Sequence, residues 1–486
     1  MRKRTGRRVF LRNVAAGGAG VLVLTAGPVA RTYAANEKLD VALIGIGGRG
    51  RWFVDTMPRM TNVVAFCDID ERKFAATSQH YAELAAKLAK SEQSWEKQAA
   101  PVYQRLAEKK LPTFADFRKM LDEMGKGIDA VVVATPDHTH AVASAAAIKA
   151  GKGVLCEKPL TRQVGESRAL RELARRHKVA TSMGNQGTAS GQFRRALELI
   201  RDGALGPIQE VHVWNTGGGA DRKEPPKGAP PVPEGLSWDL WLGPARQRAF
   251  HPEWMKRNLW RDFGTCQLGN WASHTANLAF MALKVHELWL GEPPAGGAAP
   301  RLTVEAKCSA VNRLSFPRWE TITWKVPARA DLPAVPITWH NGGAPGAWEA
   351  VRPLLQEGSG YDEANKRLPF AGAVIVGTKG RIHTTGHNAT FVLLPEADFQ
   401  GVETKEPKRV DHSRGHEMDW VLACKGGKPA WANFDYASAL NEFLMLGNVA
   451  TQFLGPLEYD PRAGKIANHA EADAALMSPY REGWAL

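Results

Sequence analysis

The ten residues VALIGIGGRG, at positions 41–50, constrain the fold of this chain more than any other stretch. The first four form a continuous apolar run, which is typical of a strand buried on both faces. The rest fit Gly-x-Gly-x-x-Gly, the turn between a strand and a helix that binds the pyrophosphate of a dinucleotide. In such a turn Gly45 permits the tight bend, Gly47 permits close approach of the pyrophosphate, and Gly50 lets the helix pack on the strand.

The next apolar run, residues 63–67, is followed directly by an aspartate, Asp68. Asp68 follows Gly50 at close to the spacing of about 20 residues at which this kind of turn has its acidic partner. A carboxylate there accepts hydrogen bonds from a ribose diol and repels a 2′-phosphate, so we expect NAD rather than NADP. The predicted cofactor contacts in this region are Gly45, Ile46, Gly47, Gly48, Arg49, Gly50 and Asp68. The alternative is that Asp68 only caps the helix that follows.

Short apolar runs alternate with longer polar stretches over the first third of the chain. The runs and stretches predict strands at 41–44, 63–66, 130–134 and 153–156, and helices at 50–57, 70–110 and 139–150. Residues 75–110, rich in Ala, Lys, Glu and Gln, are long enough for an extra helix or a helix pair. Because strands and helices alternate, we expect an α/β fold with a doubly wound Rossmann sheet.

The pattern changes after residue 160. Residues 161–205 look helical with an apolar break at 179–183, and strand-like stretches follow at 211–214, 321–326 and 373–376. Residues 217–235, rich in Gly and Pro, predict a loop, and residues 416–424 and 436–453 predict closing helices. We therefore expect a signal peptide at 1–35, an NAD-binding Rossmann domain at 36–160, and an α+β domain at 161–486, whose last helices are free to pack back on the first domain.

The N-terminus has the parts of an export signal. Residues 1–34 are basic without any acidic residue, RRVFL at 7–11 fits the twin-arginine pattern, and an apolar run spans 14–29. That run is too short and too rich in glycine to predict a membrane span. We therefore expect a periplasmic or otherwise exported protein with no stable membrane insertion after signal cleavage. The alternative is a basic helical arm followed by a short core helix.

Composition excludes several other classes of protein. Beyond the N-terminal segment, no long basic run contributes to the net charge of +13, which argues against a nucleic-acid partner. The five cysteines are widely spaced and form no CxxC pair, so we expect no metal site and no disulfide framework. Few cysteines suit a protein that folds in the cytoplasm and is exported with its cofactor already bound.

Two further motifs follow predicted strands. ATPDHTH, residues 134–140, and CEKPL, residues 156–160, lie at carboxyl ends of strands, where doubly wound sheets bind their ligands. Together with the glycine-rich turn they resemble the Gfo/Idh/MocA family, which includes glucose–fructose oxidoreductase and inositol dehydrogenase. Four later stretches resemble an exported branch of that family. They are WDLWLGP at 238–244, WR at 260–261, GTCQLGNWASHTANLAFMAL at 264–283 and YREGW at 480–484.

The resemblance implies a second domain with a large, open, mostly antiparallel sheet, and a homo-oligomer, a dimer or tetramer, that pairs through this sheet. It also implies a nicotinamide cofactor, a small carbohydrate substrate and hydride transfer at a carbon that bears a hydroxyl group. The cofactor contacts that we assign from the two motifs are Thr135, Pro136, His140, Glu157 and Lys158.

Lys158 of the CEKPL motif is the first candidate for catalysis. The resemblance implies that it sits beside the nicotinamide and the reacting hydroxyl group. A lysine that is partly desolvated and close to a positively charged ring has a lowered pKa, so that it can relay the hydroxyl proton. The alternative is a surface lysine whose stem packs in a turn fixed by Pro159.

His274 is the second candidate for catalysis. In the family, a histidine lies four residues after an aspartate on the helix that opens the second domain, and here His274 follows Asn270 at that spacing. Residues four apart share one helix face. An asparagine holds no charge against an imidazolium, which weakens an Asp–His proton relay, but Asn270 can still place His274 by a hydrogen bond or contact a substrate hydroxyl. The alternative is a structural histidine in the helix.

Four other side chains are predicted to line the same cleft. Asn185 and Gln186 follow the break at 179–183 and can hydrogen-bond a nicotinamide amide or a sugar, the alternative being a capped turn. We assign Lys158, Gln186, Trp260, Arg261, Asn270 and His274 to the substrate site. Because aromatic faces stack on sugar C–H surfaces, the tryptophans dense between 238 and 271 lead us to expect an aromatic-lined cleft.

The expected activity is NAD-dependent oxidation of a CH–OH group in a sugar, glycoside or cyclic polyol. Because free NAD is lacking outside the cytoplasm, we expect the cofactor to stay bound and to be recycled in place. One alternative is redox-neutral glycoside cleavage through a keto-sugar intermediate. The other is a cofactor-bearing sugar-binding protein without turnover.

Overall fold

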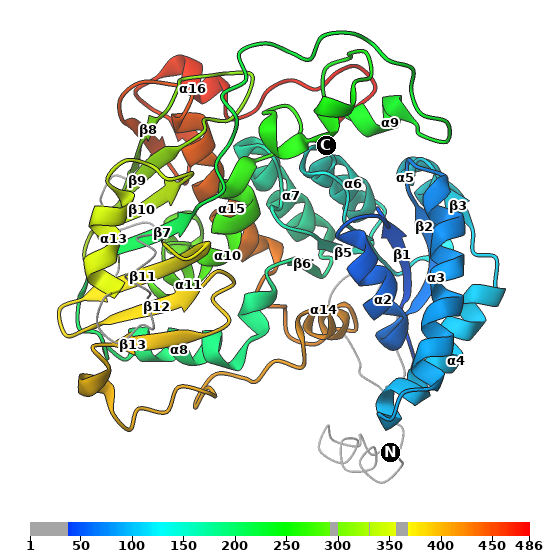
Figure 1. The fold of residues 1–486 in the computed structure, drawn as a ribbon, viewed down its shortest axis with the longest axis horizontal. Coiled ribbons are helices and arrows are strands. Elements are labelled where there is room, and N and C mark those ends of the chain that lie inside the picture. The colour runs from blue at the N-terminus through cyan, green and yellow to red at the C-terminus, as the bar shows by residue number, and fades with distance from the viewer. Residues whose placement is uncertain (1–36, 292–299, 330, 356–367) are drawn as a thin grey trace, which may run out of the picture.

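The computed structural model describes all residues except 1–36, 292–299, 330 and 356–367, so the predicted signal peptide lies outside the described part. Two sheets organise the described chain, a parallel one on the right of Figure 1 and a larger one on the left. No helix among the described residues is both long enough and apolar enough to cross a membrane.

The first domain is built on a six-stranded parallel sheet in the order β3-β2-β1-β4-β5-β6. Its strands are β1 (Asp40–Ile44), β2 (Asn62–Cys67), β3 (Thr113–Phe114), β4 (Ala130–Val133), β5 (Gly153–Cys156) and β6 (Thr181–Met183). The side chains of β1 alternate between two hydrophobic cores, with Val41 and Leu43 in one and Ala42 and Ile44 in the other. Burial on both faces therefore explains the continuous apolar run of the sequence.

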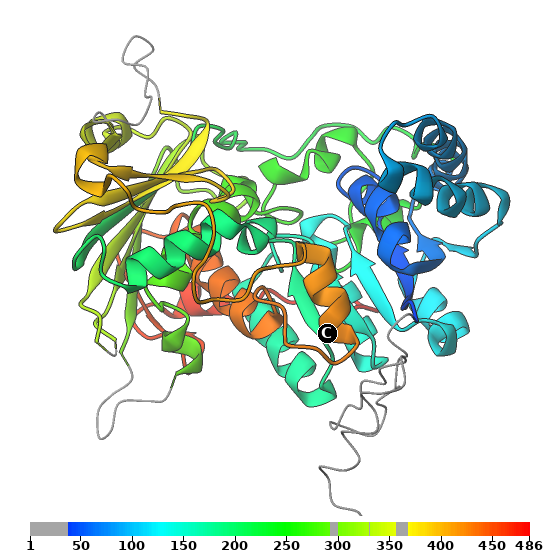
Figure 2. The same ribbon diagram turned by 90° about the horizontal axis from the view of Figure 1, so that it is seen from below.

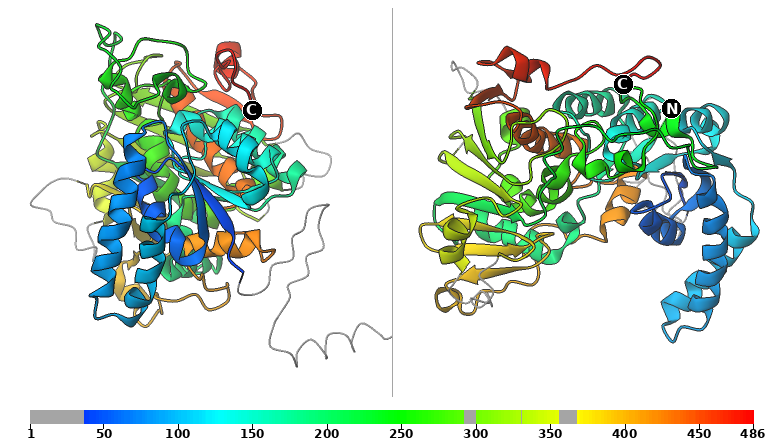
Figure 3. Two further views of the ribbon diagram at one scale, coloured as in Figure 1. Left: turned by 90° about the vertical axis from the view of Figure 1, so that its right-hand side faces the viewer. Right: turned by 45° about the horizontal axis from the view of Figure 1, so that its top comes forward.

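Helices cover both faces of this sheet (Figures 1 and 3). They are α2 (Gly50–Met60), α3 (Arg72–Ala89) and α4 (Ser94–Glu108) on one face, and α5 (Phe117–Met124), α6 (Asp137–Lys149) and α7 (Val164–His177) on the other. The predicted helix pair is thus α3 and α4, and the predicted Rossmann fold is confirmed. The sheet continues beyond residue 160, where we ended the first domain, because β6 pairs with β5.

The second domain is built on a nine-stranded sheet in the order β13-β12-β11-β7-β10-β9-β8-β14-β15. The strands are β7 (Ile208–Asn215), β8 (Leu302–Cys308), β9 (Glu320–Val326), β10 (Val335–Asn341), β11 (Ala371–Gly377), β12 (Arg381–Thr385), β13 (Phe391–Leu394), β14 (Leu457–Asp460) and β15 (Lys465–Ile466). Among these described strands only β7 and β10 pair in parallel, which confirms the expected, mostly antiparallel sheet.

Nine described α-helices follow β6 in the chain. They are α8 (Gly191–Arg201), α9 (Trp238–Leu242), α10 (Ser273–Thr275), α11 (Asn277–Ala282), α12 (Glu287–Leu290), α13 (Ala347–Leu355), α14 (His416–Cys424), α15 (Phe434–Ala450) and α16 (Ala470–Ala474). The almost wholly buried α15 contacts both α7 and β8. The orange helix α14 packs against the first domain in Figure 2, where Trp420 and Val421 join the core formed by α2 and α3.

Candidate active site

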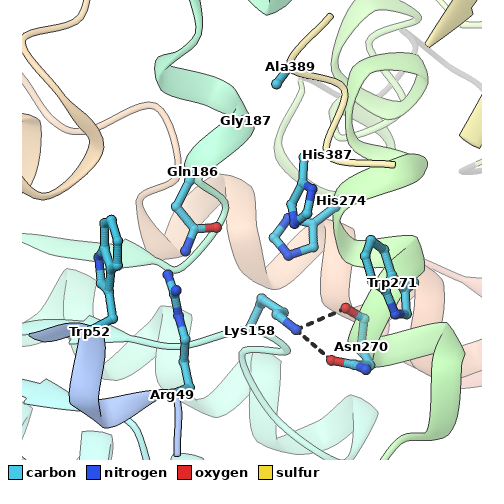
Figure 4. Close-up of a pocket in the computed structure, with 10 residues that line it drawn as sticks. All are labelled: Arg49, Trp52, Lys158, Gln186, Gly187, Asn270, Trp271, His274, His387 and Ala389. Atoms are coloured by element: carbon cyan, nitrogen blue, oxygen red, sulfur yellow. Dashed lines mark hydrogen bonds between the residues drawn. The ribbon is translucent and has the colours of Figure 1, made fainter. Parts of the chain in front are cut away.

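A cavity of about 490 Å³ lies where the two domains meet (Figure 4). Its walls are formed by Arg49, Trp52, Lys158, Gln186 and Gly187 from the first part of the chain, and by Asn270, Trp271, His274, His387 and Ala389 from the second. Arg49, Lys158 and Gln186 follow β1, β5 and β6, so the cavity is at the carboxyl edge of the parallel sheet. Open α/β sheets bind their ligands at this edge.

The glycine-rich turn has the shape that its sequence predicts. Gly45 has φ +82°, and a Cβ there would lie 2.7 Å from the Ala134 carbonyl oxygen. A Cβ at Gly50 would lie 2.0 Å from the Gly45 carbonyl oxygen, because α2 packs directly on the turn. Both positions therefore require glycine, one for its backbone conformation and one for space.

The N-terminus of α2 offers a seat for a diphosphate. No acidic residue occupies its first turn, and a Cβ at Gly48 would contact nothing within 4 Å. The side chain of Lys73 lies over Gly47, where a Cβ would be 3.4 Å from the lysine Cε. Free N–H groups at a helix N-terminus and an adjacent ammonium group are the donors that a dinucleotide diphosphate needs. Sequence reasoning missed Lys73, since nothing in its spacing marks it.

Asp68 directly follows β2. Its Oδ2 accepts from the Ile46 N–H at 2.9 Å and its Oδ1 from the Asp70 N–H at 3.0 Å. Burial raises the pKa of Asp68, and these two N–H groups oppose that rise. α3 begins later, at Arg72, so Asp68 does not cap it. Each carboxylate oxygen keeps acceptor capacity for a ribose hydroxyl.

Thr135 and Pro136 continue from β4 toward the same turn. The Thr135 Oγ1 is buried without a hydrogen-bond partner among the described residues, and the Gly45 turn packs against the Thr135 backbone. An orphaned hydroxyl costs free energy unless a ligand satisfies it. The glycine turn, the Lys73 ammonium group, Asp68 and this hydroxyl are together a donor and acceptor set that fits a dinucleotide.

Lys158 is held inside the cavity wall rather than on the surface. Its Nζ donates to the Asn270 backbone carbonyl oxygen at 3.0 Å and to the Asn270 Oδ1 at 2.5 Å, as the dashed lines in Figure 4 show. Burial lowers the pKa of Lys158, while the charges of Glu157 and Asp137 oppose that change. A lysine with a lowered pKa exchanges protons more readily near neutral pH.

Glu157 anchors the loop that carries Lys158. Its Oε1 pairs with the Arg49 Nε at 2.8 Å, and its Oε2 accepts from the Lys158 N–H at 3.1 Å. The Gln186 amide satisfies both neighbours when its oxygen accepts from Arg49 and its nitrogen donates to the Gly184 carbonyl oxygen at 2.8 Å. Glu157 therefore braces the predicted cofactor turn and the predicted catalytic lysine against each other.

His274 lies beside Lys158 in the opposite wall. It is buried, and burial together with the charges of Lys158 and His387 lowers its pKa well below the ordinary value. The Asn270 side-chain oxygen engages Lys158, and no described residue hydrogen-bonds the His274 ring, so the expected hydrogen bond from Asn270 to His274 is absent. Asn270 lies in the π-helical turn Leu268–Ala272 and His274 in α10 directly after it, and both side chains line the cavity.

His140 and Asn185, which we predicted to contact a cofactor, do not line the cavity, and their side chains are engaged with backbone groups. The His140 Nδ1 lies 2.7 Å from the Pro159 carbonyl oxygen and its Nε2 lies 2.8 Å from the Thr135 carbonyl oxygen, so the buried ring ties two motifs together. Asn185 is buried and donates to the Ser273 carbonyl oxygen at 2.8 Å. Both residues position the elements that carry Lys158 and His274.

Trp260 and Arg261 also lie away from the cavity, although we assigned them to the substrate site. Trp260 is 2% exposed and packs against Trp254 in a buried aromatic cluster with Trp238 and Trp241. The Arg261 guanidinium donates to the carbonyl oxygens of Asn312, at 2.7 Å, and Asn448, at 3.1 Å, and to the Thr451 Oγ1, at 2.8 Å.

Most of the tryptophans that we expected in an aromatic-lined cleft do not line the cavity. Trp271 is the one tryptophan of the dense stretch that lines the cavity, and Trp52 faces it from α2. His387, in the turn between β12 and β13, also lines the cavity and was missed, because an isolated histidine in a loop carries no motif. Among the described residues, no three His, Cys, Asp or Glu side chains gather into a metal site.

Comparison with known proteins identifies the first domain. Residues 39–185 match the model of the Gfo/Idh/MocA family, described as an oxidoreductase family with an NAD-binding Rossmann fold. Inositol 2-dehydrogenase 1 of Saccharopolyspora erythraea is 48% identical over 69 residues, which are 14% of this chain and 19% of that protein. Levoglucosan dehydrogenase of Pseudarthrobacter phenanthrenivorans is 33% identical over 94 residues, 19% of this chain and 24% of that protein. The chain thus spans about a quarter or less of the length of these relatives.

A solved structure extends the similarity of fold to both domains. The WlbA dehydrogenase from Bordetella pertussis, in complex with NADH and UDP-GlcNAcA, superposes with a TM-score of 0.51. The match has 13% sequence identity and covers 86% of this chain and 97% of the other. The predicted NAD-binding Rossmann domain and the two-domain architecture are therefore confirmed.

Proposed function

We propose that this chain, whose residues 39–185 match an oxidoreductase family with an NAD-binding Rossmann fold, is an exported NAD-dependent enzyme that acts on a CH–OH group of a carbohydrate. One observation carries the proposal: the Lys158 Nζ is fixed in a cavity wall at the carboxyl end of β5, with the His274 ring beside it. Similarity to an inositol dehydrogenase and a levoglucosan dehydrogenase supports a sugar, glycoside or cyclic polyol as substrate.

The cofactor residues divide the task of binding. The α2 N-terminus and Lys73 hold the diphosphate, and Asp68 holds a ribose diol. When bound, NAD⁺ accepts a hydride from the carbon that bears the reacting hydroxyl group. Trp52 and Trp271 offer apolar faces to the sugar C–H surface, and Gln186 offers hydrogen bonds to its hydroxyl groups.

Lys158 and His274 manage the hydroxyl proton. As the C–H bond breaks, the O–H bond of the same carbon must lose its proton for a carbonyl group to form. Burial keeps His274 neutral, so that it can accept this proton, and Lys158 can hold the oxygen through its N–H groups. Asn270 fixes the direction of the Lys158 Nζ through two hydrogen bonds.

Export and cofactor recycling belong to the same proposal. The twin-arginine pattern at 7–11 supports export of a folded protein, and the tight glycine turn supports retention of NAD. A retained cofactor has to be reoxidised in place, by a second substrate or by the oxidised intermediate itself. The open second sheet supports a homo-oligomer.

The test has two stages. Purified protein is denatured and the released ligand is identified by mass spectrometry, with NAD expected rather than NADP. Levoglucosan, myo-inositol and a panel of glycosides are then incubated with the protein, and products are analysed for net oxidation or cleavage. Turnover that Lys158→Ala abolishes is the expected result. Saturable sugar binding without turnover, in the presence of either form of the cofactor, would leave only a binding protein.

A further inference from the structure

We propose that His387 is a proton-relay residue of this site, which passes the substrate proton between His274 and solvent. The inference rests on the proposed function. It starts from a juxtaposition: the ring centroids of His387 and His274 are 4.7 Å apart, and Figure 4 shows His274 between His387 and Lys158. Three nitrogen bases from three separate segments of the chain thus follow one another along the cavity wall.

The turn that carries His387 is held rigidly by its neighbour Asn388. Asn388 adopts the left-handed backbone conformation, with φ 53°, and its side chain is buried. Its Oδ1 accepts from the Leu278 N–H at 3.0 Å, and its Nδ2 donates to the Thr275 carbonyl oxygen at 3.1 Å. Because Thr275 directly follows His274, these bonds join the two histidine-bearing segments.

Two further contacts fix the same turn from the first part of the chain. The Ser190 Oγ donates to the Ala389 carbonyl oxygen at 2.8 Å. A Cβ at Gly187 would lie 2.2 Å from the His387 carbonyl oxygen, so the turn that carries His387 packs directly against this glycine. A proton-transfer group requires a fixed position, and these contacts provide one for His387.

The two histidines differ in their access to water. His274 is 3% exposed, whereas His387 is an exposed residue of the cavity wall. Trp271 packs beside both rings, with its ring centroid 5.3 Å from that of His387 and 6.4 Å from that of His274, and limits the movement of His387. His387 is therefore placed to connect a buried base with solvent.

The site needs such a connection because each oxidation releases one proton. The O–H bond breaks, an N–H bond forms on His274, and the electron pair of the O–H bond becomes part of the carbonyl double bond. The buried His274 imidazolium then faces Lys158, His387, Arg49 and His416, all of which disfavour its charge. Asn270 cannot take the proton, so His387 accepts it and releases it to water, while the hydrogen with the two electrons of the C–H bond goes to NAD⁺.

The groups that face His387 have the charges that such a relay needs. Although His387 reaches solvent, partial burial of its ring and the positive charges of Lys158 and Arg49 lower its pKa. Of the residues that line the cavity, none is acidic. An imidazole in this setting loses a proton quickly, as a relay must, rather than storing it in an ion pair.

The first experiment measures the coupling of the two rings without any substrate. In ¹⁵N-histidine NMR titrations of the NAD-loaded protein, His387→Gln should raise the pKa of His274, because a neighbouring positive charge is removed. The exposed His412 provides a matched control, since His412→Gln should leave the pKa of His274 unchanged. An unchanged pKa of His274 in His387→Gln would overturn the proposal.

The second experiment measures proton transfer with levoglucosan as the probe. In single-turnover reduction of the bound cofactor, His387→Gln should slow the reaction by about 10-fold or more, and imidazole added to the buffer should restore much of the rate. Asn388→Ala, which disturbs the turn, should also slow the reaction but without imidazole rescue. A wild-type rate in His387→Gln overturns the relay. If no probe sugar reduces the cofactor in the unaltered protein, the proposed function fails, and the titrations alone decide on the histidine pair.

Discussion

The two walls of the cavity are built in different ways. Arg49, Lys158 and Gln186 follow directly after strands of the parallel sheet, whereas Asn270 and His387 come from a π-helical turn and a hairpin turn more than a hundred residues apart. The first wall is set by strand ends that the topology forces to one edge. The second wall is set by side-chain contacts such as those of Asn388.

The two walls therefore differ in what a substitution is expected to change. The first wall holds the lysine and the cofactor turn, which any substrate of the reaction needs. In the proposed function, the second wall holds His274 and His387, which handle the substrate proton, and these residues are not part of the parallel sheet. Substitutions in the first wall should therefore affect turnover itself, and substitutions in the second should tune its pH dependence.

The largest expected effect is the loss of the Lys158 amine. Lys158→Ala should lower turnover by about 10²–10⁴-fold, which is the usual contribution of a proton-transfer group, while bound NAD is retained. Single-turnover reduction of the bound cofactor measures the rate, and mass spectrometry measures retention. Lys110→Ala, at an exposed position of the same domain, should change neither. Full turnover in Lys158→Ala would show that the lysine of the first wall takes no part in the reaction.

The second effect concerns the glycine turn. Gly50→Ala places a methyl group 2.0 Å from the Gly45 carbonyl oxygen, so α2 has to move off the strand. We expect a loss of about 1–3 kcal/mol in the free energy of unfolding and a loss of most bound NAD. Gly127→Ala is the control, because a Cβ there would contact nothing within 4 Å. Retained NAD in Gly50→Ala would show that this turn does not seat the diphosphate.

The sequence predicted the first wall well because its signals are local. The apolar run of β1, the glycines after it and the strand that precedes Lys158 each follow from neighbouring residues, and parallel pairing brings them to one edge. Even the helix at 416–424 was predicted with its observed bounds. In the parallel-sheet domain, β3 and α5, a two-residue strand and a short helix, were not predicted from the periodicity.

The second wall could not be predicted in the same way. Trp260 and Arg261 lie in a stretch that resembles the family, but burial gives both of them partners in the protein interior. His387 reaches the second wall only through tertiary packing of β12 and β13, and packing of α3 likewise brings Lys73 over the glycine turn of the first domain. Such residues are recognised by what surrounds them, and a single sequence does not record that.

The third effect compares two histidines of α6 that support the first wall. Burial alone would lower the pKa of His140, but Cys156, Asp137 and the Pro159 carbonyl oxygen together raise it to about 9. Burial lowers the pKa of His138 to about 4. The contribution of His140 to stability is thus fully present below its unfolded pKa of about 6.5 and is lost as the pH rises through about 9. That of His138 is present above about 6.5 and is lost as the pH falls through about 4.

Urea unfolding from pH 5 to pH 10 tests this opposition. Relative to His140→Gln, the unaltered protein should lose on the order of 2 kcal/mol of stability between neutral pH and about pH 9.5. Relative to His138→Gln, the unaltered protein should instead lose stability as the pH falls below neutral. Parallel curves for the two variants would mean that neither ring has a shifted pKa, and that His140 does not tie the Thr135 and Pro159 segments together by its charge.

The smallest expected effect lies where the two walls touch. Asn270→Asp sets a carboxylate against the Lys158 Nζ, which now contacts the amide oxygen at 2.5 Å. An opposite charge at this distance favours the ammonium form, so the pKa of Lys158 should rise by about 1 unit or more. If deprotonated Lys158 assists the reaction, the rising limb of the pH–rate profile moves to higher pH by the same amount. Asn270→Ala removes the hydrogen bond to the side chain without adding charge, so it should not move this limb upward. If the rising limb of the pH–rate profile does not shift in Asn270→Asp, the observed ionisation belongs to His274. Proton transfer would then take place wholly in the second wall.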